Sequence, residues 1–266
     1  MIKPGEIQKI AGKCKVKDGQ IEKDYILSWI LYGISQNKFL FENLIFKGGT
    51  TLKKAYYKDY RFSEDLDFTL FDDNISKVGI FREFDKIFEF IREEANISLQ
   101  RKPETEFETG NINFYILYGG PLGGTLGKKD LKIDLSRFEK ILFHVDANNI
   151  FRDYSDLKKP FRIKCYSKQE VLIEKMRSII ERTQPRDIYD LWYMLDVDNL
   201  DLEAYRTEFE LKVKHKGLNP EDFMNKLEEK ESKFKIMWEK YLSNQIHNLP
   251  DFNGVFRDLL KHLRKF

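Results

Sequence analysis

The spacing of apolar positions predicts helices over most of the first forty residues. In the stretch 21–36, apolar side chains recur every three to four positions, which indicates a helix with a buried face. The apolar run 44–46 is typical of a short buried strand. The segment Lys47-Gly-Gly-Thr-Thr51 then leads into a helix predicted over 52–57. The pattern therefore predicts a strand, a glycine turn and a helix in direct succession.

The middle of the chain has the alternation of a sheet. Polar and apolar residues alternate over 65–70, and again over 111–118 and 131–135, which predicts three strands. A long amphipathic helix is predicted over 75–94, between the first two of these strands. The glycine-rich segment 119–124 connects the last two as a turn or loop.

The last hundred residues are predicted to be helical. A final strand over 161–166 is followed by Ser167, which we expect to cap a helix that ends near Arg182, with Glu170 at the capping-box position. Beyond Pro185 only helices are predicted, including one over 223–242. We therefore expect an α/β (α+β) domain over 1–165 and a mostly helical domain over 166–266 that completes the active-site cleft.

Composition narrows the class of protein without naming a partner. The chain has 266 residues, 41% of them hydrophobic, and a formal net charge of only +2. The global charge therefore gives no argument for nucleic-acid binding. We find neither an apolar leader at the start nor a run of about 20 apolar residues. With two cysteines and four scattered histidines, we expect no zinc site. We expect a cytoplasmic location and no membrane partner.

Three aspartates are candidates for a metal site. In a strand, residues two apart project from the same face, so Asp65 and Asp67 point the same way. Two adjacent carboxylates repel each other unless a cation lies between them, and Mg²⁺ prefers oxygen ligands. Asp134 lies at a polar position of the strand 131–135 and would join them if the two strands are neighbours. Three carboxylates can hold two metal ions about 3.5–4 Å apart for phosphoryl transfer.

The glycine turn supplies a second kind of chemistry. Gly48 and Gly49 allow the backbone to approach a phosphate, and the helix that follows offers free N–H groups. Thr50 adds a hydroxyl, while Lys47 and Lys53 could add positive charge. Neither GxxxxGK[ST] nor GxGxxG is present, so this is not one of the common phosphate loops. Alone, such a turn is usually only a turn, but followed by paired aspartates it favours nucleotide binding.

These motifs resemble those of the AbiEii/AbiGii toxin family, type IV toxin–antitoxin nucleotidyltransferases of the MenT-like kind. The resemblance begins with Lys47-Gly-Gly-Thr-Thr-Leu-Lys53 and Arg61-Phe-Ser-Glu-Asp-Leu-Asp67. It continues in Leu131-Lys-Ile-Asp134 and in Lys175, Arg182 and Arg186-Asp-Ile-Tyr-Asp-Leu191. It implies a polymerase-β-like nucleotidyltransferase sheet with helices, followed by a C-terminal helical bundle.

The resemblance also implies roles for individual residues. Asp65, Asp67 and Asp134 would bind the metal, Mg²⁺ or alternatively Mn²⁺, and with Lys175 and Asp187 would form the catalytic set. Nucleotide-binding roles fall to Gly48, Gly49, Thr50, Lys53, Arg61 and Ser63. Asp190 is a weaker candidate. From the residues alone, a lysine in the middle of a helix such as Lys175 is usually solvated, and Asp187 reads as a capping residue.

The expected activity is transfer of a nucleoside monophosphate from an NTP to an acceptor. The resemblance implies the 3′ end of tRNA as acceptor, and a cognate antitoxin encoded nearby. The best local RNA-binding candidate comprises Lys158, Lys159, Arg162, Lys164 and Lys168, although a solvated charge run explains it as well. Two alternatives stay open: a small-molecule nucleotidyltransferase of the antibiotic-resistance type, and a non-catalytic nucleotide-binding module. The preferred base of the NTP is not indicated.

Overall fold

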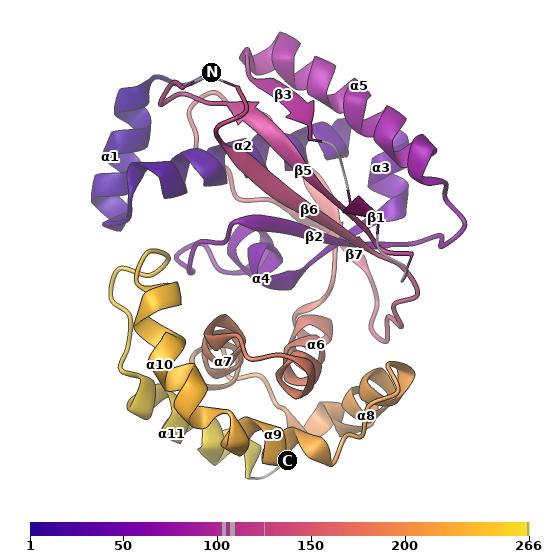
Figure 1. Ribbon diagram of the computed structural model, residues 1–266, viewed down its shortest axis with the longest axis vertical. Coiled ribbons are helices and arrows are strands. Elements are labelled where there is room, and N and C mark those ends of the chain that lie inside the picture. Colours follow the sequence, from indigo (N-terminus) through magenta and orange to yellow (C-terminus); the bar gives the residue numbers. More distant parts are fainter. Residues whose placement is uncertain (103–104, 107–109, 125, 265) are drawn as a thin grey trace. The chain divides into compact units, whose positions relative to one another are not determined.

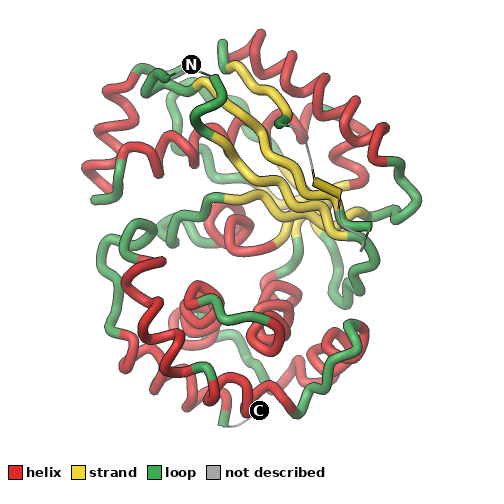
Figure 2. Tube along the Cα trace, in the orientation of Figure 1, coloured by secondary structure: helices red, strands yellow, loops and turns green. Residues whose placement is uncertain are grey.

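The chain forms two units in the computed structural model, which describes residues 1–102, 105–106, 110–124, 126–264 and 266. Unit 1 comprises Met1–Glu139 and Val145–Cys165, and unit 2 comprises Lys140–His144 and Tyr166–Phe266. Unit 1 combines a mixed sheet with helices, whereas the described residues of unit 2 form only helices and their connections (Figures 1 and 2). The predicted α/β class is confirmed. The expectation that the C-terminal domain completes an active-site cleft stays a prediction.

Eight strands form the sheet of unit 1 in the described residues. They are β1 (Leu44–Lys47), β2 (Asp65–Leu70), β3 (Ser98–Arg101), β4 (Thr105–Glu106), β5 (Ile112–Gly119), β6 (Asp130–Ser136), β7 (Asp146–Asn149) and β8 (Arg162–Cys165). Their order is β3-β5-β6-β2-β1-β8-β7, with β4 also paired to β5. The pairs β2–β6 and β1–β8 are parallel, and the others are antiparallel. The short polar strands β3 and β7 were not predicted, because neither has apolar alternation.

One face of this sheet is buried by two of the helices of unit 1, α2 and α5. The described helical segments of this unit are α1 (Pro4–Cys14), α2 (Asp18–Gln36), α3 (Lys38–Asn43), α4 (Gly48–Thr51), the π-helical turn η1 (Leu52–Tyr56) and α5 (Lys77–Ala95). Apolar residues of α2 and α5 share one core with Leu66 and Phe68 of β2 and Ile133 of β6. Because strand residues alternate between faces, this core fixes the opposite face as the one that carries the polar residues of β2 and β6.

The helix predicted over 52–57 begins earlier than expected. Gly48 has a φ of +79°, so the chain turns directly from β1 into α4, and the glycine pair forms the first helical turn. From Leu52 the backbone widens into the π-helical turn, in which the Tyr57 N–H donates to the Leu52 carbonyl over 2.8 Å. The glycine turn and the helix are therefore one continuous element.

Unit 2 is built from helices. They are α6 (Lys168–Glu181), α7 (Pro185–Trp192), the π-helical turn η2 (Tyr193–Val197), the 3-10 turn η3 (Glu203–Tyr205), α8 (Arg206–His215), α9 (Asp222–Glu229), α10 (Glu231–Leu242) and α11 (Phe252–Leu263). The prediction of a single helix over 223–242 is wrong, because the helix is interrupted at Lys230 and forms α9 and α10. The Lys230 ammonium donates to the carbonyls of Ile179 and Ile180 at the end of α6, over 2.6 and 3.1 Å.

The predicted cap of α6 is only half right. Ser167 caps the helix as expected, since its hydroxyl accepts the Glu170 N–H over 3.1 Å. Glu170 does not complete a capping box. Its carboxylate instead accepts the N–H groups of Leu142 and Phe143 over 2.7 and 2.9 Å, and the Lys212 ammonium over 2.5 Å. This buried side chain therefore holds the 140–144 segment within unit 2. Among the described helices, none is long and apolar enough to cross a membrane.

Candidate functional site

Two of the candidate carboxylates lie side by side on the polar face of the sheet. In the parallel pair β2–β6, Asp67 is opposite Asp134 and Asp65 is opposite Lys132. All four side chains are half-buried, whereas the alternate positions Leu66 and Ile133 are fully buried. The apolar alternation thus forces these polar residues onto one face, as the sequence predicted.

Lys132 compensates part of the negative charge on this face. Its ammonium lies 2.8 Å from Asp134 Oδ2. Burial alone would lower the pKa of Lys132, but the hydrogen bond and charge of Asp134, together with the charge of Asp65, raise it. The other oxygen, Asp134 Oδ1, is buried and has no hydrogen-bond partner among the described residues. A buried carboxylate oxygen of this kind is costly unless a donor or cation satisfies it.

The donor chemistry of this face fits a divalent cation. Asp65, Asp67 and Asp134 supply carboxylate oxygens, the ligands that Mg²⁺ and Mn²⁺ accept, and Asp134 Oδ1 is the atom that such an ion would satisfy. Nevertheless, the described residues include no group of three or more Asp, Glu, His or Cys already arranged as a metal site. Metal binding by the three aspartates therefore stays a prediction.

The glycine turn lies directly against this face. A Cβ atom at Gly48 would be only 2.6 Å from Asp67 Oδ2, and the φ of +79° is one that side chains rarely adopt. This φ favours glycine at the position, and the short distance shows how closely its backbone approaches the Asp67 carboxylate. The adjacent Lys47 is opposite Asp67 in the antiparallel pair β1–β2. The backbone at the start of α4 is therefore held against a candidate metal ligand, which is the arrangement expected of a phosphate-holding turn. Direct contact of Gly48 and Gly49 with phosphate stays a prediction.

Thr50 and Lys53 both make contacts within the protein. The Thr50 hydroxyl donates to the backbone carbonyl of Asp65 over 2.6 Å, so it ties α4 to β2. Lys53 donates to the carbonyl of Lys58 over 2.5 Å and lies over the Phe62 ring, 4.7 Å from its centroid. Burial lowers the pKa of Lys53. Thr50 therefore ties α4 to the start of β2, and Lys53 contacts the loop 57–64 between η1 and β2. Nucleotide binding by either residue stays a prediction.

Arg61 and Ser63 lie in that same loop and are buried. The Arg61 guanidinium donates to the carbonyl of Phe62 over 3.2 Å, which is consistent with a bracing role. Ser63 is only 6% exposed. Their predicted contacts with a nucleotide stay predictions.

Sequence reasoning missed one carboxylate close to the turn. Glu139 follows β6, and its Oε1 lies 3.6 Å from the ammonium of Lys47. Both side chains are 7% exposed. Since Lys47 is the cross-strand neighbour of Asp67, this pair borders the candidate site. No spacing in the sequence marks Glu139, because it lies beyond the alternating residues of β6.

The remaining predicted residues form a buried cluster in unit 2. Lys175 of α6 lies 2.7 Å from Asp187 Oδ1 and 2.7 Å from Asp190 Oδ2, two residues of α7. Arg182 donates to both oxygens of Asp187, over 2.9 and 3.1 Å. Positions three apart on a helix share a face, so the RDxxD spacing presents both aspartates to the lysine.

This cluster corrects two interpretations made from the residues alone. Lys175 is 7% exposed rather than solvated, and the buried carboxylate of Asp187 binds Lys175 and Arg182 rather than capping its helix. Burial by itself would raise the pKa of Asp187, but the charges of Lys175 and Arg182 hold this pKa below its ordinary value. A catalytic role for Lys175 and Asp187 stays a prediction.

The basic residues proposed for RNA do not behave alike. Lys158 and Lys159 are exposed in unit 1. Arg162 and Lys164 each donate to a backbone carbonyl, over 2.7 and 3.0 Å. Lys168 belongs to unit 2 and pairs with an aspartate over 2.6 Å. The expectation of an RNA-binding surface therefore stays a prediction.

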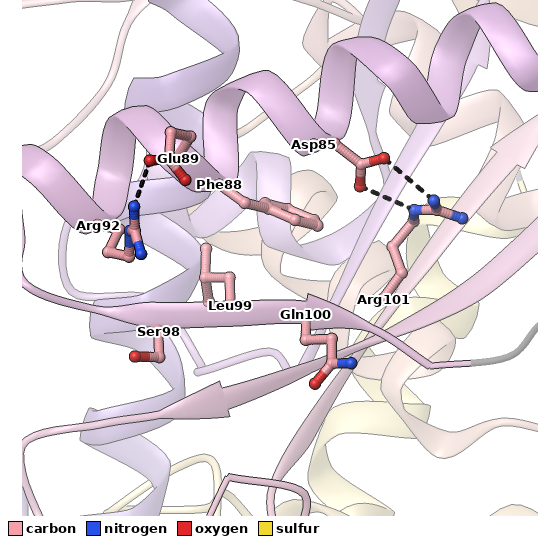
Figure 3. A pocket seen from close by; sticks show the side chains of 8 residues that line it. All are labelled: Asp85, Phe88, Glu89, Arg92, Ser98, Leu99, Gln100 and Arg101. Carbon is pink, nitrogen blue, oxygen red and sulfur yellow. Dashed lines mark hydrogen bonds and ion pairs between the residues drawn. The ribbon is translucent and has the colours of Figure 1, made fainter.

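A pocket of about 410 Å³ lies elsewhere in unit 1, between α5 and β3 (Figure 3). It contains none of the predicted site residues. Asp85 binds Arg101 through both carboxylate oxygens, each contact 3.1 Å long, and Glu89 pairs with Arg92. These charges therefore pair with each other within the pocket.

Comparison with known proteins identifies one family and several solved structures with a similar fold. The sequence model of the nucleotidyl transferase AbiEii toxin family, described as a type IV toxin–antitoxin system, matches residues 29–261. The fold is similar to MenT4, a nucleotidyltransferase toxin from Mycobacterium tuberculosis, with a TM-score of 0.63 and 16% identity over 100% of this chain and 91% of that one. It is also similar to JHP933 from Helicobacter pylori, with a TM-score of 0.61 and 14% identity over 94% and 92%.

No curated protein sequence matches the chain. The family match confirms the resemblance drawn from the motifs. At such low identities, the two solved structures support the fold alone.

Proposed function

The chain belongs to the AbiEii family of nucleotidyltransferase toxins of type IV toxin–antitoxin systems, and from this premise we propose that it transfers a nucleoside monophosphate from an NTP to the 3′ end of tRNA. Membership of the family implies nucleotidyltransferase activity and a cognate antitoxin. The tRNA acceptor and a requirement for Mg²⁺, with Mn²⁺ as an alternative, are parts of the proposal. So is a cytoplasmic location, where NTPs and tRNA occur.

The observation that carries the proposal is the meeting of three segments. Asp67 and Asp134 are in register on β2 and β6, and Gly48, whose φ of +79° favours glycine, lies directly against the Asp67 carboxylate. Two acids in contact with a backbone turn at a helix start are what a nucleoside triphosphate with its cation would need.

The proposed reaction exchanges one bond to phosphorus for another. The acceptor hydroxyl oxygen forms a bond to the α-phosphorus, the bond from that phosphorus to the bridging oxygen breaks, and pyrophosphate leaves. The hydroxyl proton passes to water or to one of the carboxylates. When bound, a divalent cation neutralises phosphate charge and lowers the pKa of the acceptor hydroxyl.

The residues of this chain provide orientation. Asp65, Asp67 and Asp134 would hold the cation, and the backbone of Gly48, Gly49 and Thr50 would hold the phosphates. Lys175 and Asp187 are proposed as the basic and orienting residues of the family motif, and Asp190 as a further partner of Lys175.

The test uses NTPs labelled at the α-phosphate, because that phosphate stays on the product. Purified protein, Mg²⁺ and each labelled NTP are incubated with total RNA or with small-molecule acceptors. We expect label on tRNA, and we expect Asp67→Asn to reduce it by about 10²–10³-fold, the range measured for loss of one charge-stabilising group. Asp85→Asn, in the α5–β3 pocket, is the matched control and should label like wild type (Figure 3).

Two results would count against the proposal. Label on small molecules but not on RNA would favour the antibiotic-resistance type of enzyme. Equal incorporation by wild type and Asp67→Asn would remove the catalytic assignment of Asp67, and nucleotide binding by wild type without label on any acceptor would favour a nucleotide-binding module.

A further inference from the structure

Three consecutive charged residues of α2, Glu22, Lys23 and Asp24, each contact a different segment of the candidate site. They precede residue 29, where the family match begins. Successive residues of a helix differ in direction by about 100°, so three in a row can reach three separate neighbours. Glu22 and Asp24 are almost completely buried, at 1% and 2% exposure, which is rare for acids and requires paired charges.

Asp24 binds the element that follows the glycine turn. Its Oδ2 lies 2.6 Å from the ammonium of Lys54 in η1, and it also accepts the Tyr154 hydroxyl over 2.6 Å. The same ammonium donates to the Ser28 hydroxyl over 2.9 Å. Lys54 is fully buried. Because α4 continues directly into η1, fixing Lys54 fixes the helix that begins at Gly48.

Lys23 reaches the start of β2. Its ammonium lies 3.0 Å from Oε2 of Glu64, the residue immediately before Asp65. The two side chains are 25% and 42% exposed, so this is the most solvated of the three contacts.

Glu22 anchors the β5–β6 loop, residues 120–129, of which the structure describes 120–124 and 126–129. One carboxylate oxygen accepts the Leu122 N–H over 2.8 Å, and the other lies 2.6 Å from the Lys129 ammonium. A Cβ atom at Gly120 would be 2.5 Å from Glu22 Oε1, so the loop backbone packs directly on this carboxylate. The loop leads into β6, which carries Asp134.

These three contacts lie at one end of the sheet. Lys47, the last residue of β1, is opposite Asp67, and Asp65, the first residue of β2, is opposite Lys132 near the start of β6. The first turns of α2 therefore contact the segments that bear the glycine turn, the pair Asp65 and Asp67, and Asp134.

We propose that Glu22, Lys23 and Asp24 are positioning residues that hold these three segments in mutual register for nucleotide transfer. The inference rests on the proposed function for its kinetic consequence, but its structural consequence can be measured without activity. None of the three residues needs to touch substrate. Displacing a site component by about 1 Å can cost 10²-fold in rate, so contacts this far from the reacting atoms can still control catalysis.

The kinetic test separates the two buried acids. Asp24→Asn should raise the KM for NTP by about tenfold or more, since misplaced binding groups of a preorganised site lose affinity on that scale. Glu22→Gln should lower kcat while the KM for NTP stays near the wild-type value, because Glu22 contacts the loop that leads into the strand of Asp134 and not the glycine turn. Asp85→Asn, a carboxylate of the same unit in the α5–β3 pocket, is the control and should leave both constants unchanged (Figure 3).

A double variant distinguishes positioning from mere support of the fold. Asp24→Asn with Lys54→Met removes both buried charges, so thermal stability should recover relative to Asp24→Asn alone. If Asp24 positions the glycine turn, the KM for NTP stays raised in the double variant. A KM that returns to wild type together with stability would overturn the proposal for this contact.

Amide hydrogen exchange provides the readout that does not require activity. Glu22→Gln and Lys129→Met should both accelerate exchange at Leu122 and its loop neighbours, while α5 keeps wild-type protection. If wild type proves inactive, accelerated exchange confined to these segments would still support the positioning role of these residues. Only the proposed function would then fail. Wild-type exchange in both variants, or wild-type kcat and KM in folded Glu22→Gln and Asp24→Asn, would overturn the proposal.

Discussion

Each unit contains a lysine–aspartate ion pair with nearly the same distance between its charged atoms, but the two pairs differ in how far they are exposed. In unit 1, Lys132 and Asp134 are 2.8 Å apart and 32% and 23% exposed. In unit 2, Lys175 and Asp187 are 2.7 Å apart and 7% and 1% exposed. The first pair lies on an open strand face, and the second is enclosed between α6 and α7, where Arg182 and Asp190 add further compensation.

The difference lies in what the charge is available to do. A half-exposed carboxylate with one buried, unsatisfied oxygen can exchange a lysine contact for a cation at modest cost. A carboxylate enclosed with two cationic partners is part of the fold, because removing either partner leaves a buried charge. The pair of unit 1 is therefore suited to ligand binding, while that of unit 2 must first be understood as the link between two helices.

The largest expected effect is that of Lys175→Gln on stability. Loss of the ammonium leaves Asp187 and Asp190 buried without their shared partner, which should cost about 3–5 kcal/mol of unfolding free energy. In a Trp29→Phe background, the two remaining tryptophans, Trp192 and Trp238, both lie in unit 2 and report its denaturant unfolding by fluorescence. A loss below about 1 kcal/mol, typical of an exposed pair, would erase the contrast.

Acid should weaken unit 2 through Asp187. Its pKa is lower in the folded chain than the ordinary 3.8, so the folded state is favoured while the group is ionised. This contribution is fully present above pH 3.8 and is lost as the pH falls through the lower folded pKa. We expect wild type to lose more fluorescence-detected stability than Asp187→Asn between pH 5 and the acid limit, since the amide does not titrate. Parallel curves for the two proteins would contradict this assignment.

The smallest expected effect is that of Lys132→Gln. Because this pair is partly solvated, its loss should change the unfolding free energy of unit 1 by less than about 1 kcal/mol. Hydrogen exchange of the β6 amides at equilibrium measures it. A loss comparable to that of Lys175→Gln would show that the two pairs serve the same structural purpose.

Much of the carboxylate face could be predicted from the sequence. Period-two alternation over 65–70 and 131–135 places the aspartates on the polar face, and a one-residue slip would bury them in place of leucine and isoleucine. The strands lacking this alternation, β3 and β7, were missed for the same reason. The 223–242 pattern predicted one helix, because local periodicity does not reveal that Lys230 is fixed by carbonyls of α6.

Long-range charge pairs escaped prediction altogether. Glu170 occupies a capping-box position in sequence, yet Lys212 and the 142–143 backbone take its carboxylate. Glu22 and Asp24 look like ordinary solvated residues at the start of a helix, and their partners Lys129 and Lys54 are 107 and 30 positions away. Nothing local distinguishes a charge that will be buried from one that stays in water.

The sequence by itself determined the type of chemistry: strands with acids on one face, a glycine turn beside them, and motifs specific enough to indicate the family. Only the tertiary structure decided which charges face solvent and which are enclosed, that Asp134 stands next to Asp67, and that α2 contacts all three segments of the candidate site. The physical reason is range. Periodicity and turn chemistry act over a few residues, whereas burial and ion pairing depend on groups that only the completed fold brings together.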